Sequence, residues 1–216
     1  FALILALATR LPDYQAAVRA GEWSRSPFFC LLDFPITELA GKTLGVIGYG
    51  TLGQGVAGIA RAFDMDVQVA ARPGASDIPA DRVAVEDLLQ RADVLTLHCP
   101  LTDATRGLIG RAELERMKPH ALLINTARGG IVDEAALAEA LRAGLIGGAG
   151  MDVLTQEPPR DGNPLLADDI PNLIVTPHAA WGSQAARQRL VEQVADHIAD
   201  FGAGRPDNVV AGPEGA

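Results

Sequence analysis

Three polar residues that could carry acid chemistry each follow a short apolar run of this sequence. Arg128, Glu157 and His178 come after the runs at 121–125, 148–153 and 173–176. If these runs are strands of one parallel sheet, the three side chains meet at its carboxyl edge, where such sheets bind ligands. A guanidinium can hold a carboxylate, and a carboxylate beside an imidazole keeps that ring protonated near neutrality. The pattern predicts a site that grips an acid and moves a proton.

A glycine-rich loop, residues 48–53, follows an apolar run and opens a helical pattern. In this context Gly48 permits a tight turn, Gly50 lets the backbone approach a pyrophosphate, and Gly53 lets the helix pack closely on the strand. Free N–H groups at the start of the helix can bind the phosphates. The loop predicts a dinucleotide site, and the alternative is a glycine-rich turn without a ligand.

The end of the second predicted strand bears on which dinucleotide binds. Ala71 stands where an acidic residue would accept hydrogen bonds from a ribose 2′-hydroxyl, and Arg72 follows it. A guanidinium at this place can pair with a 2′-phosphate, so the sequence favours NADP over NAD. In the alternative interpretation Arg72 is a solvated loop charge and both cofactors are accepted.

The elements that must position these residues are short apolar runs that alternate with helical patterns, which is typical of a parallel sheet. We predict strands at 43–47, 66–70, 93–97, 121–125, 148–153 and 173–176, and helices at 51–63, 85–90, 111–117 and 133–143, the last capped by Asp133. Right-handed connections place helices on both faces. The expected fold class is therefore α/β, a Rossmann-type doubly wound parallel sheet.

Two further helical patterns flank the sheet. One covers residues 1–20, and the other runs from its cap Ser183 to Phe201 with an apolar stripe. Because no strand follows the second helix, we expect both to pack on another domain. The expected segments are 1–40, a linker helix and loop; 41–182, the dinucleotide-binding domain; and 183–216, a helix and a tail.

Composition excludes several classes of protein. The 216 residues carry a formal charge of −9 and no run of Lys or Arg, which argues against nucleic-acid binding. Cys30 and Cys99 lie far apart, so neither a zinc site nor a disulfide framework is indicated, and a reducing cytoplasm is the expected compartment. The apolar opening is too short to span a bilayer and has no basic leader. It begins inside a helical pattern without Met, so we expect a preceding segment.

Four segments become recognisable when they are taken together. They are the glycine loop, Asn-Thr-Ala-Arg-Gly-Gly at 125–130, Asp-Val-x-x-x-Glu-Pro at 152–158 and Pro-His at 177–178. In this order they resemble the D-isomer-specific 2-hydroxyacid dehydrogenase family, over essentially the whole chain. His-Cys-Pro-Leu-Thr at 98–102 and Trp181 are most similar to its glycerate dehydrogenase and hydroxypyruvate reductase branch.

The resemblance implies a role for each residue of the site. Arg128 would bind the substrate carboxylate and carbonyl, His178 would be the acid/base, and Glu157 would pair with His178. Asp152 would lie near the nicotinamide carboxamide, although a turn or capping aspartate is an equal alternative. The implied cofactor-binding residues are Gly48, Gly50, Thr51, Leu52, Gly53, Arg72, Cys99, Pro100, Thr105, Thr126, Ala127, Arg128, Asp152 and His178.

The resemblance also implies a cofactor domain inserted in a flavodoxin-like substrate domain, an active site between the two, and a homodimer formed largely through the cofactor domain. This sequence lacks the substrate-domain segment with which the family begins, so we expect the flanking helices to expose apolar faces. The expected activity is NAD(P)-dependent interconversion of a short D-2-hydroxy acid and its 2-oxo acid, either glycerate and hydroxypyruvate or glycolate and glyoxylate. The alternatives are a non-catalytic dinucleotide-binding sensor or corepressor and an inactive cofactor-binding fragment.

Overall fold

The computed structural model describes residues 1–75 and 77–209, in two compact units, Phe1–Pro177 and His178–Ala216. The first unit contains the sheet and the helices around it, and the second contains one long helix. Residues 210–216, the end of the predicted tail, lie outside the described residues.

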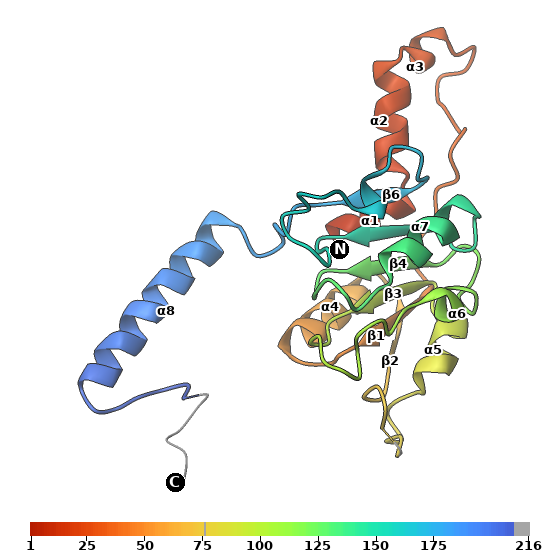
Figure 1. Cartoon of the computed structure of the whole chain (residues 1–216). Coiled ribbons are helices and arrows are strands. Elements are labelled where there is room, and N and C mark those ends of the chain that lie inside the picture. Colours follow the sequence, from red (N-terminus) through yellow and green to blue (C-terminus); the bar gives the residue numbers. More distant parts are fainter. Residues whose placement is uncertain (76, 210–216) are drawn as a thin grey trace. The chain divides into compact units, whose positions relative to one another are not determined.

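The sheet has six parallel strands in the order β2-β1-β3-β4-β5-β6 (Figure 1). They are β1 (Thr43–Ile47), β2 (Asp66–Val69), β3 (Val94–Leu97), β4 (Leu122–Asn125), β5 (Gly148–Met151) and β6 (Leu173–Val175). Each predicted strand is present, which confirms the Rossmann-type fold class. The chain order reverses direction between β1 and β3, so a crevice for a ligand is expected at the carboxyl ends of these two strands.

Helices cover both faces of the sheet. The first unit contains α1 (Ala2–Ala8), α2 (Leu11–Arg19), α3 (Glu22–Arg25), α4 (Thr51–Ala62), α5 (Val85–Arg91), α6 (Arg111–Leu114), α7 (Glu134–Arg142) and the 3₁₀ turn η1 (Pro164–Leu166). One core packs α1 and α4 on the sheet, and the other packs α5, α6 and α7 on it. The four helices predicted between the strands are confirmed, and the Asp133 side chain caps α7 by accepting a hydrogen bond from the Ala136 N–H.

The single helix predicted over residues 1–20 is wrong, because the chain breaks after Ala8 into α1 and α2. Arg10 adopts a left-handed φ of 54°, and Pro12 lies in the first turn of α2. Proline has no N–H and its ring clashes with the carbonyl four residues earlier, so a continuous helix cannot pass through this position. The expectation of an exposed apolar face is also wrong for α1, since Ile4 and Leu7 are buried against the sheet.

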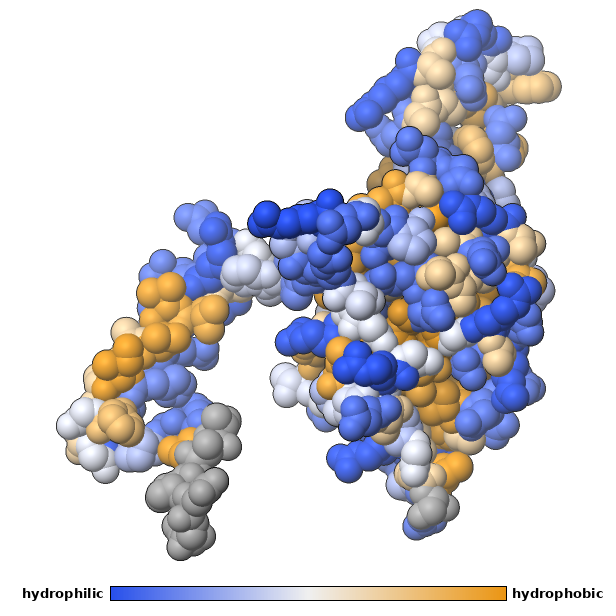
Figure 2. All heavy atoms as spheres, viewed as in Figure 1, coloured by the Kyte–Doolittle hydropathy of each residue, from blue (hydrophilic) through white to orange (hydrophobic). Residues whose placement is uncertain are grey.

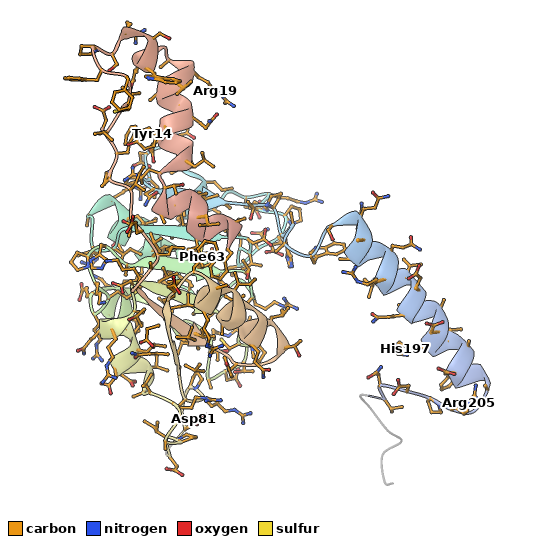
Figure 3. The ribbon with its side chains drawn as sticks, turned by 180° about the vertical axis from the view of Figure 1, so that it is seen from behind. Tyr14, Arg19, Phe63, Asp81, His197 and Arg205 are labelled. Atoms are coloured by element: carbon orange, nitrogen blue, oxygen red, sulfur yellow. The ribbon has the colours of Figure 1, made fainter. Side chains whose placement is uncertain are left out.

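The segment 11–36, here called the arm, contains α2, α3 and the chain that returns toward β1. Its base is held by Tyr14, whose hydroxyl donates to the Phe34 carbonyl over 2.8 Å and whose ring meets the Phe34 ring edge-on (Figure 3). The arm exposes several large apolar side chains to solvent: Trp23, Phe28, Phe29, Leu32 and Ile36. Their exposure makes the arm a candidate contact surface.

The second unit consists of α8 (Gln184–Gly202) and the segments that flank it. The Ser183 side chain accepts a hydrogen bond from the Ala186 N–H, which confirms the predicted cap. Apolar side chains gather along one face of α8 (Figure 2), and its large members Leu190, Val194, Ile198 and Phe201 are all exposed. In the part of the chain that the structure describes, no helix is long and apolar enough to cross a membrane.

Candidate active site

The glycine loop between β1 and α4 has the close contacts that its sequence predicts. A Cβ on Gly48, whose φ is +93°, would lie 2.5 Å from the Cys99 backbone nitrogen, and a Cβ on Gly53 would lie 2.2 Å from the Gly48 carbonyl oxygen. A side chain at either position would push the loop off β3 or push α4 off β1. These two glycines are therefore required by packing inside the protein.

Gly50 differs, because none of the described residues requires a glycine there. Its φ is −78°, and a Cβ would meet no atom within 4 Å. Gly50 is also the N-cap of α4, and no side chain caps this helix. The first-turn N–H groups are thus left for an external acceptor, and the open space at Gly50 fits a phosphate group that approaches the backbone closely. This arrangement fits a dinucleotide pyrophosphate.

A pocket of about 590 Å³ opens beside this loop. Its lining comes from the start of α4 and from the chain that follows β3 and β4: Leu52, His98, Cys99, Pro100, Leu101, Thr126, Ala127 and Arg128. Six of these eight were among the predicted site residues. The other two, His98 and Leu101, lie directly after β3, and their place at a strand's carboxyl end was the signal that could have identified them.

Two groups in the pocket wall titrate away from their usual range. Burial lowers the pKa of His98, whose Nε2 lies 3.0 Å from the Thr96 hydroxyl, so this ring favours its neutral form. Burial raises the pKa of the Cys99 thiol, which keeps it protonated and unreactive. The positive charge of the pocket wall is therefore that of Arg128.

Arg128 reaches the pocket because the buried Asn125 at the end of β4 shapes the loop that follows. The Asn125 amide donates to the Arg128 carbonyl over 3.0 Å, and its oxygen accepts from the Ala127 N–H over 3.0 Å. The Arg128 side chain is exposed, and in the described part of the chain its guanidinium has no carboxylate partner. An unneutralised cation at a pocket suits an anionic ligand.

The loop that carries Glu157 follows β5 and touches the loop that carries Arg128. A Cβ on Gly129 would lie 2.0 Å from the Leu154 carbonyl oxygen, so the two loops meet backbone against backbone. One carboxylate oxygen of Glu157, Oε1, accepts the Leu154 N–H over 2.8 Å, which fixes the side chain at the start of its loop. The structure thus brings together the predicted arginine and glutamate loops.

His178 is the first residue of the second unit. Its φ of 52° lies in the left-handed region, which a residue other than glycine occupies at a cost of about 1 kcal/mol or more. Such backbone outliers cluster at functional sites, where the surroundings hold them. The pairing of His178 with Glu157 stays a prediction.

The predicted residues that do not line the pocket include three with distinct surroundings. Asp152 is buried, and its Oδ1 accepts the Thr176 hydroxyl. The buried Thr105 hydroxyl donates to the Pro100 carbonyl over 2.6 Å and shapes the pocket wall from behind. Arg72 is exposed after β2, and its guanidinium makes no hydrogen bond or ion pair with any described residue. Their roles in cofactor binding stay predictions.

Comparison with known proteins agrees with this geometry. The family model of the "D-isomer specific 2-hydroxyacid dehydrogenase, NAD binding domain" matches residues 1–180. A glycerate dehydrogenase of Methylorubrum extorquens is 51% identical over 96% of this chain and 65% of its own length. A glyoxylate reductase of Aeropyrum pernix is 41% identical over 97% of this chain and 64% of its own.

Among solved structures, an acyclic imino acid reductase in complex with NADPH and D-Arg superposes with a TM-score of 0.84 at 32% identity, covering 98% of this chain and 66% of that one. The chain thus spans somewhat less than two thirds of the length of the two curated relatives. The family match, the parallel sheet and the glycine loop with its pocket lead to one conclusion: the chain belongs to the D-isomer-specific 2-hydroxyacid dehydrogenase family.

Proposed function

We propose that this chain is the cofactor-binding part of an NAD(P)-dependent dehydrogenase that interconverts a short D-2-hydroxy acid and its 2-oxo acid. The observation that carries the proposal is the pocket in which the unneutralised Arg128 lies beside the glycine loop. The names of the relatives favour glycerate and hydroxypyruvate, or glycolate and glyoxylate, as the acid pair. Family membership favours this enzyme over a sensor or corepressor.

The residues of the site have distinct tasks in this mechanism. The glycine loop and the start of α4 would hold NAD(P)H, which would supply the hydride for the carbonyl carbon of the 2-oxo acid. Arg128 binds the carboxylate and carbonyl of the acid and so holds the carbon in line. His178 donates a proton to the carbonyl oxygen as it becomes a hydroxyl, and Glu157 orients the imidazole for this transfer.

The test uses the full-length gene product that contains residues 1–216, assayed for reduction of hydroxypyruvate and of glyoxylate. We expect His178→Ala to abolish turnover and to leave cofactor binding nearly intact, because the proton donor is lost while the glycine loop is unchanged. Cofactor binding is measured by fluorescence titration. Retention of a large fraction of wild-type turnover would remove His178 from the acid/base role, and a wild type inactive on both acids would favour an inactive cofactor-binding protein.

We propose NADP as the preferred cofactor. Arg72 supports this preference, because its exposed guanidinium has no partner among the described residues and stands where Ala71 offers no acceptor to a ribose hydroxyl. The imino acid reductase with a similar structure is a complex with NADPH. We expect a lower KM for NADPH than for NADH, and a rise in the NADPH value alone in Arg72→Ala. A clear NADH preference of the wild type would refute the proposal.

We propose that two copies of the chain associate through the arm. Seven large apolar side chains of the arm are exposed, more than a solvated segment of this length requires. Sedimentation of the wild type should give a dimer, and Phe29→Asp should give a monomer because it places a charge in the contact. Ile78→Asp, an exposed apolar position outside the arm, is the control and should remain dimeric.

We propose further that the exposed stripe of α8 packs on the part of the relatives that this chain does not span. The stripe is apolar along the whole helix, as expected for a face that another domain covers. Hydrogen exchange of residues 184–202 should be slow in the full-length gene product, and Val194→Asp should speed it.

We propose a reducing cytoplasm as the compartment of this protein. The free thiols of Cys30 and Cys99 support this proposal, which cell fractionation can test.

A further inference from the structure

We propose that Glu134 is a positioning residue for Glu157, and that it acts by clasping both ends of the loop that carries Glu157. The proposal rests on the proposed function, in which Glu157 orients the acid/base His178. Glu134 lies at the first position of α7, outside the pocket and outside the set of predicted site residues.

Three hydrogen bonds converge on the carboxylate of Glu134. Its Oε1 accepts the Thr155 backbone N–H over 2.6 Å and the Thr155 hydroxyl over 3.0 Å. Its Oε2 accepts the side-chain amide of Asn163 over 2.6 Å. Both oxygens are thus occupied by donors from one loop, and hydrogen bonds to a charged acceptor are about twice as strong as neutral ones.

The two contact residues bracket Glu157 in the sequence. Thr155 precedes it and Asn163 follows it, so one carboxylate fixes the start and the end of the loop between them. The Asn163 amide is itself oriented, because its oxygen accepts the Leu165 N–H over 2.9 Å. Glu157 is exposed, and its position depends on how firmly the loop around it is held.

The helix that carries Glu134 is a rigid base for this contact. Leu137 and Leu141 on the next two turns are buried in the core, so α7 cannot follow a movement of the loop. The capping of α7 does not need Glu134, since Asp133 already accepts the Ala136 N–H. The carboxylate of Glu134 therefore serves the loop that carries Glu157.

An exchange of donor and acceptor tests this contact at nearly constant shape. Glu134→Gln places an amide against the Asn163 amide, and Asn163→Asp places a carboxylate against the Glu134 carboxylate while it still accepts the Leu165 N–H. The double variant Glu134→Gln/Asn163→Asp restores one donor and one acceptor with their places exchanged. Glu139→Gln is the control, because Glu139 lies on the same helix and pairs with Arg111 away from the loop.

In the full-length gene product we expect each single variant to lower kcat for hydroxypyruvate reduction roughly 10-fold, because a displaced catalytic group slows the reaction while binding persists. The KM for the cofactor should stay within about twofold, since the glycine loop is untouched. The double variant should return kcat to within about twofold of wild type.

Hydrogen exchange of residues 154–163 provides a readout that needs no activity. Exchange should be faster in both single variants and return to the wild-type rate in the double variant. Single variants that keep the wild-type kcat in an active protein would overturn the proposal. If the wild type has no reductase activity, the proposed function fails, and the clasp is judged by exchange alone: faster exchange that the double variant reverses supports it, and unchanged exchange overturns it.

Discussion

The charged side chains at the two edges of the sheet differ in whether they have partners inside the protein. At the amino edge, Asp93 precedes β3 and its carboxylate accepts the Thr43 N–H over 2.8 Å, the Lys118 ammonium over 2.9 Å and the His120 Nε2 over 2.8 Å, with 11% of its side chain exposed. At the carboxyl edge, Arg128 is exposed at a pocket without a carboxylate partner among the described residues.

The difference separates charge that holds the fold from charge that is left for a ligand. Burial by itself would raise the pKa of Asp93, but the hydrogen bonds from Thr43, Lys118 and His120 lower it to about 2. The negative charge of Asp93 is therefore compensated by hydrogen-bond donors inside the protein. A cation without an internal carboxylate partner contributes little to folding, so the Arg128 guanidinium is available to an anionic ligand.

The largest expected effect is on activity at the carboxyl edge. Arg128→Ala should lower kcat/KM for hydroxypyruvate by roughly a hundredfold or more, because a bidentate, charge-assisted contact to the acid is lost. The melting temperature should hardly change, since no internal ion pair is broken. Arg128→Lys should recover only part of the rate, because an ammonium cannot make the two parallel bonds. If Arg128→Ala keeps a rate close to wild type, Arg128 does not serve a ligand, and the contrast with Asp93 at the amino edge fails.

The glycine loop allows a matched comparison on one helix. Gly53→Ala should weaken cofactor binding at least 10-fold and destabilise the protein, because its Cβ would lie 2.2 Å from the Gly48 carbonyl oxygen. Gly58→Ala, also on α4, meets nothing within 4 Å and should stabilise the helix by up to about 1 kcal/mol. Titration calorimetry and urea unfolding measure the two effects. Equal behaviour of the two variants would contradict the packing argument.

At the amino edge the expected effect is on stability. Asp93→Ala should lower the free energy of unfolding by about 2–3 kcal/mol, because it leaves the Thr43 N–H, the Lys118 ammonium and the His120 ring without their acceptor. Among molecules that remain folded, kcat should not change. Asp87→Ala removes an exposed carboxylate from α5 and should cost less than about 0.5 kcal/mol. A large loss of kcat in Asp93→Ala would show that the two edges are coupled.

The smallest expected effect is the pH dependence that Asp93 contributes. Its pKa in the folded protein, about 2, lies below the ordinary value of 3.8. The stabilisation is therefore complete above about pH 4 and is lost as the pH falls through the folded pKa. Unfolding free energies measured from pH 5 to pH 2 should fall less steeply for Asp93→Asn than for the wild type. Parallel curves would contradict the assignment.

Much of the carboxyl edge could be predicted because its signals are local. An apolar run ending in a glycine or a polar residue marks a strand end, and parallel pairing brings such ends together. The clasp at Glu134 could not be predicted, because Asn163 lies 29 residues further along the chain and only the packing of α7 beside the β5 loop brings the two together. The Asp93 contacts were missed for the same reason, since His120 follows Asp93 by 27 residues.

The break at Arg10 shows how local rules compete. The helical apolar pattern over residues 1–20 is continuous, but the proline at position 12 overrides it and lets α1 turn against the sheet. Inspection of the proline would have corrected the prediction.

The sequence by itself determined the six strands, the helices between them, the glycine loop and the family of this protein, because periodicity and short motifs depend on neighbouring residues. Tertiary structure decided which charges are neutralised inside the protein and which remain open. Asp93 and Glu134 find donors through pairing of distant segments, whereas the Arg128 guanidinium has no carboxylate partner among the described residues. Partners of a charge are set by contacts across the chain, and no local pattern of residues encodes them.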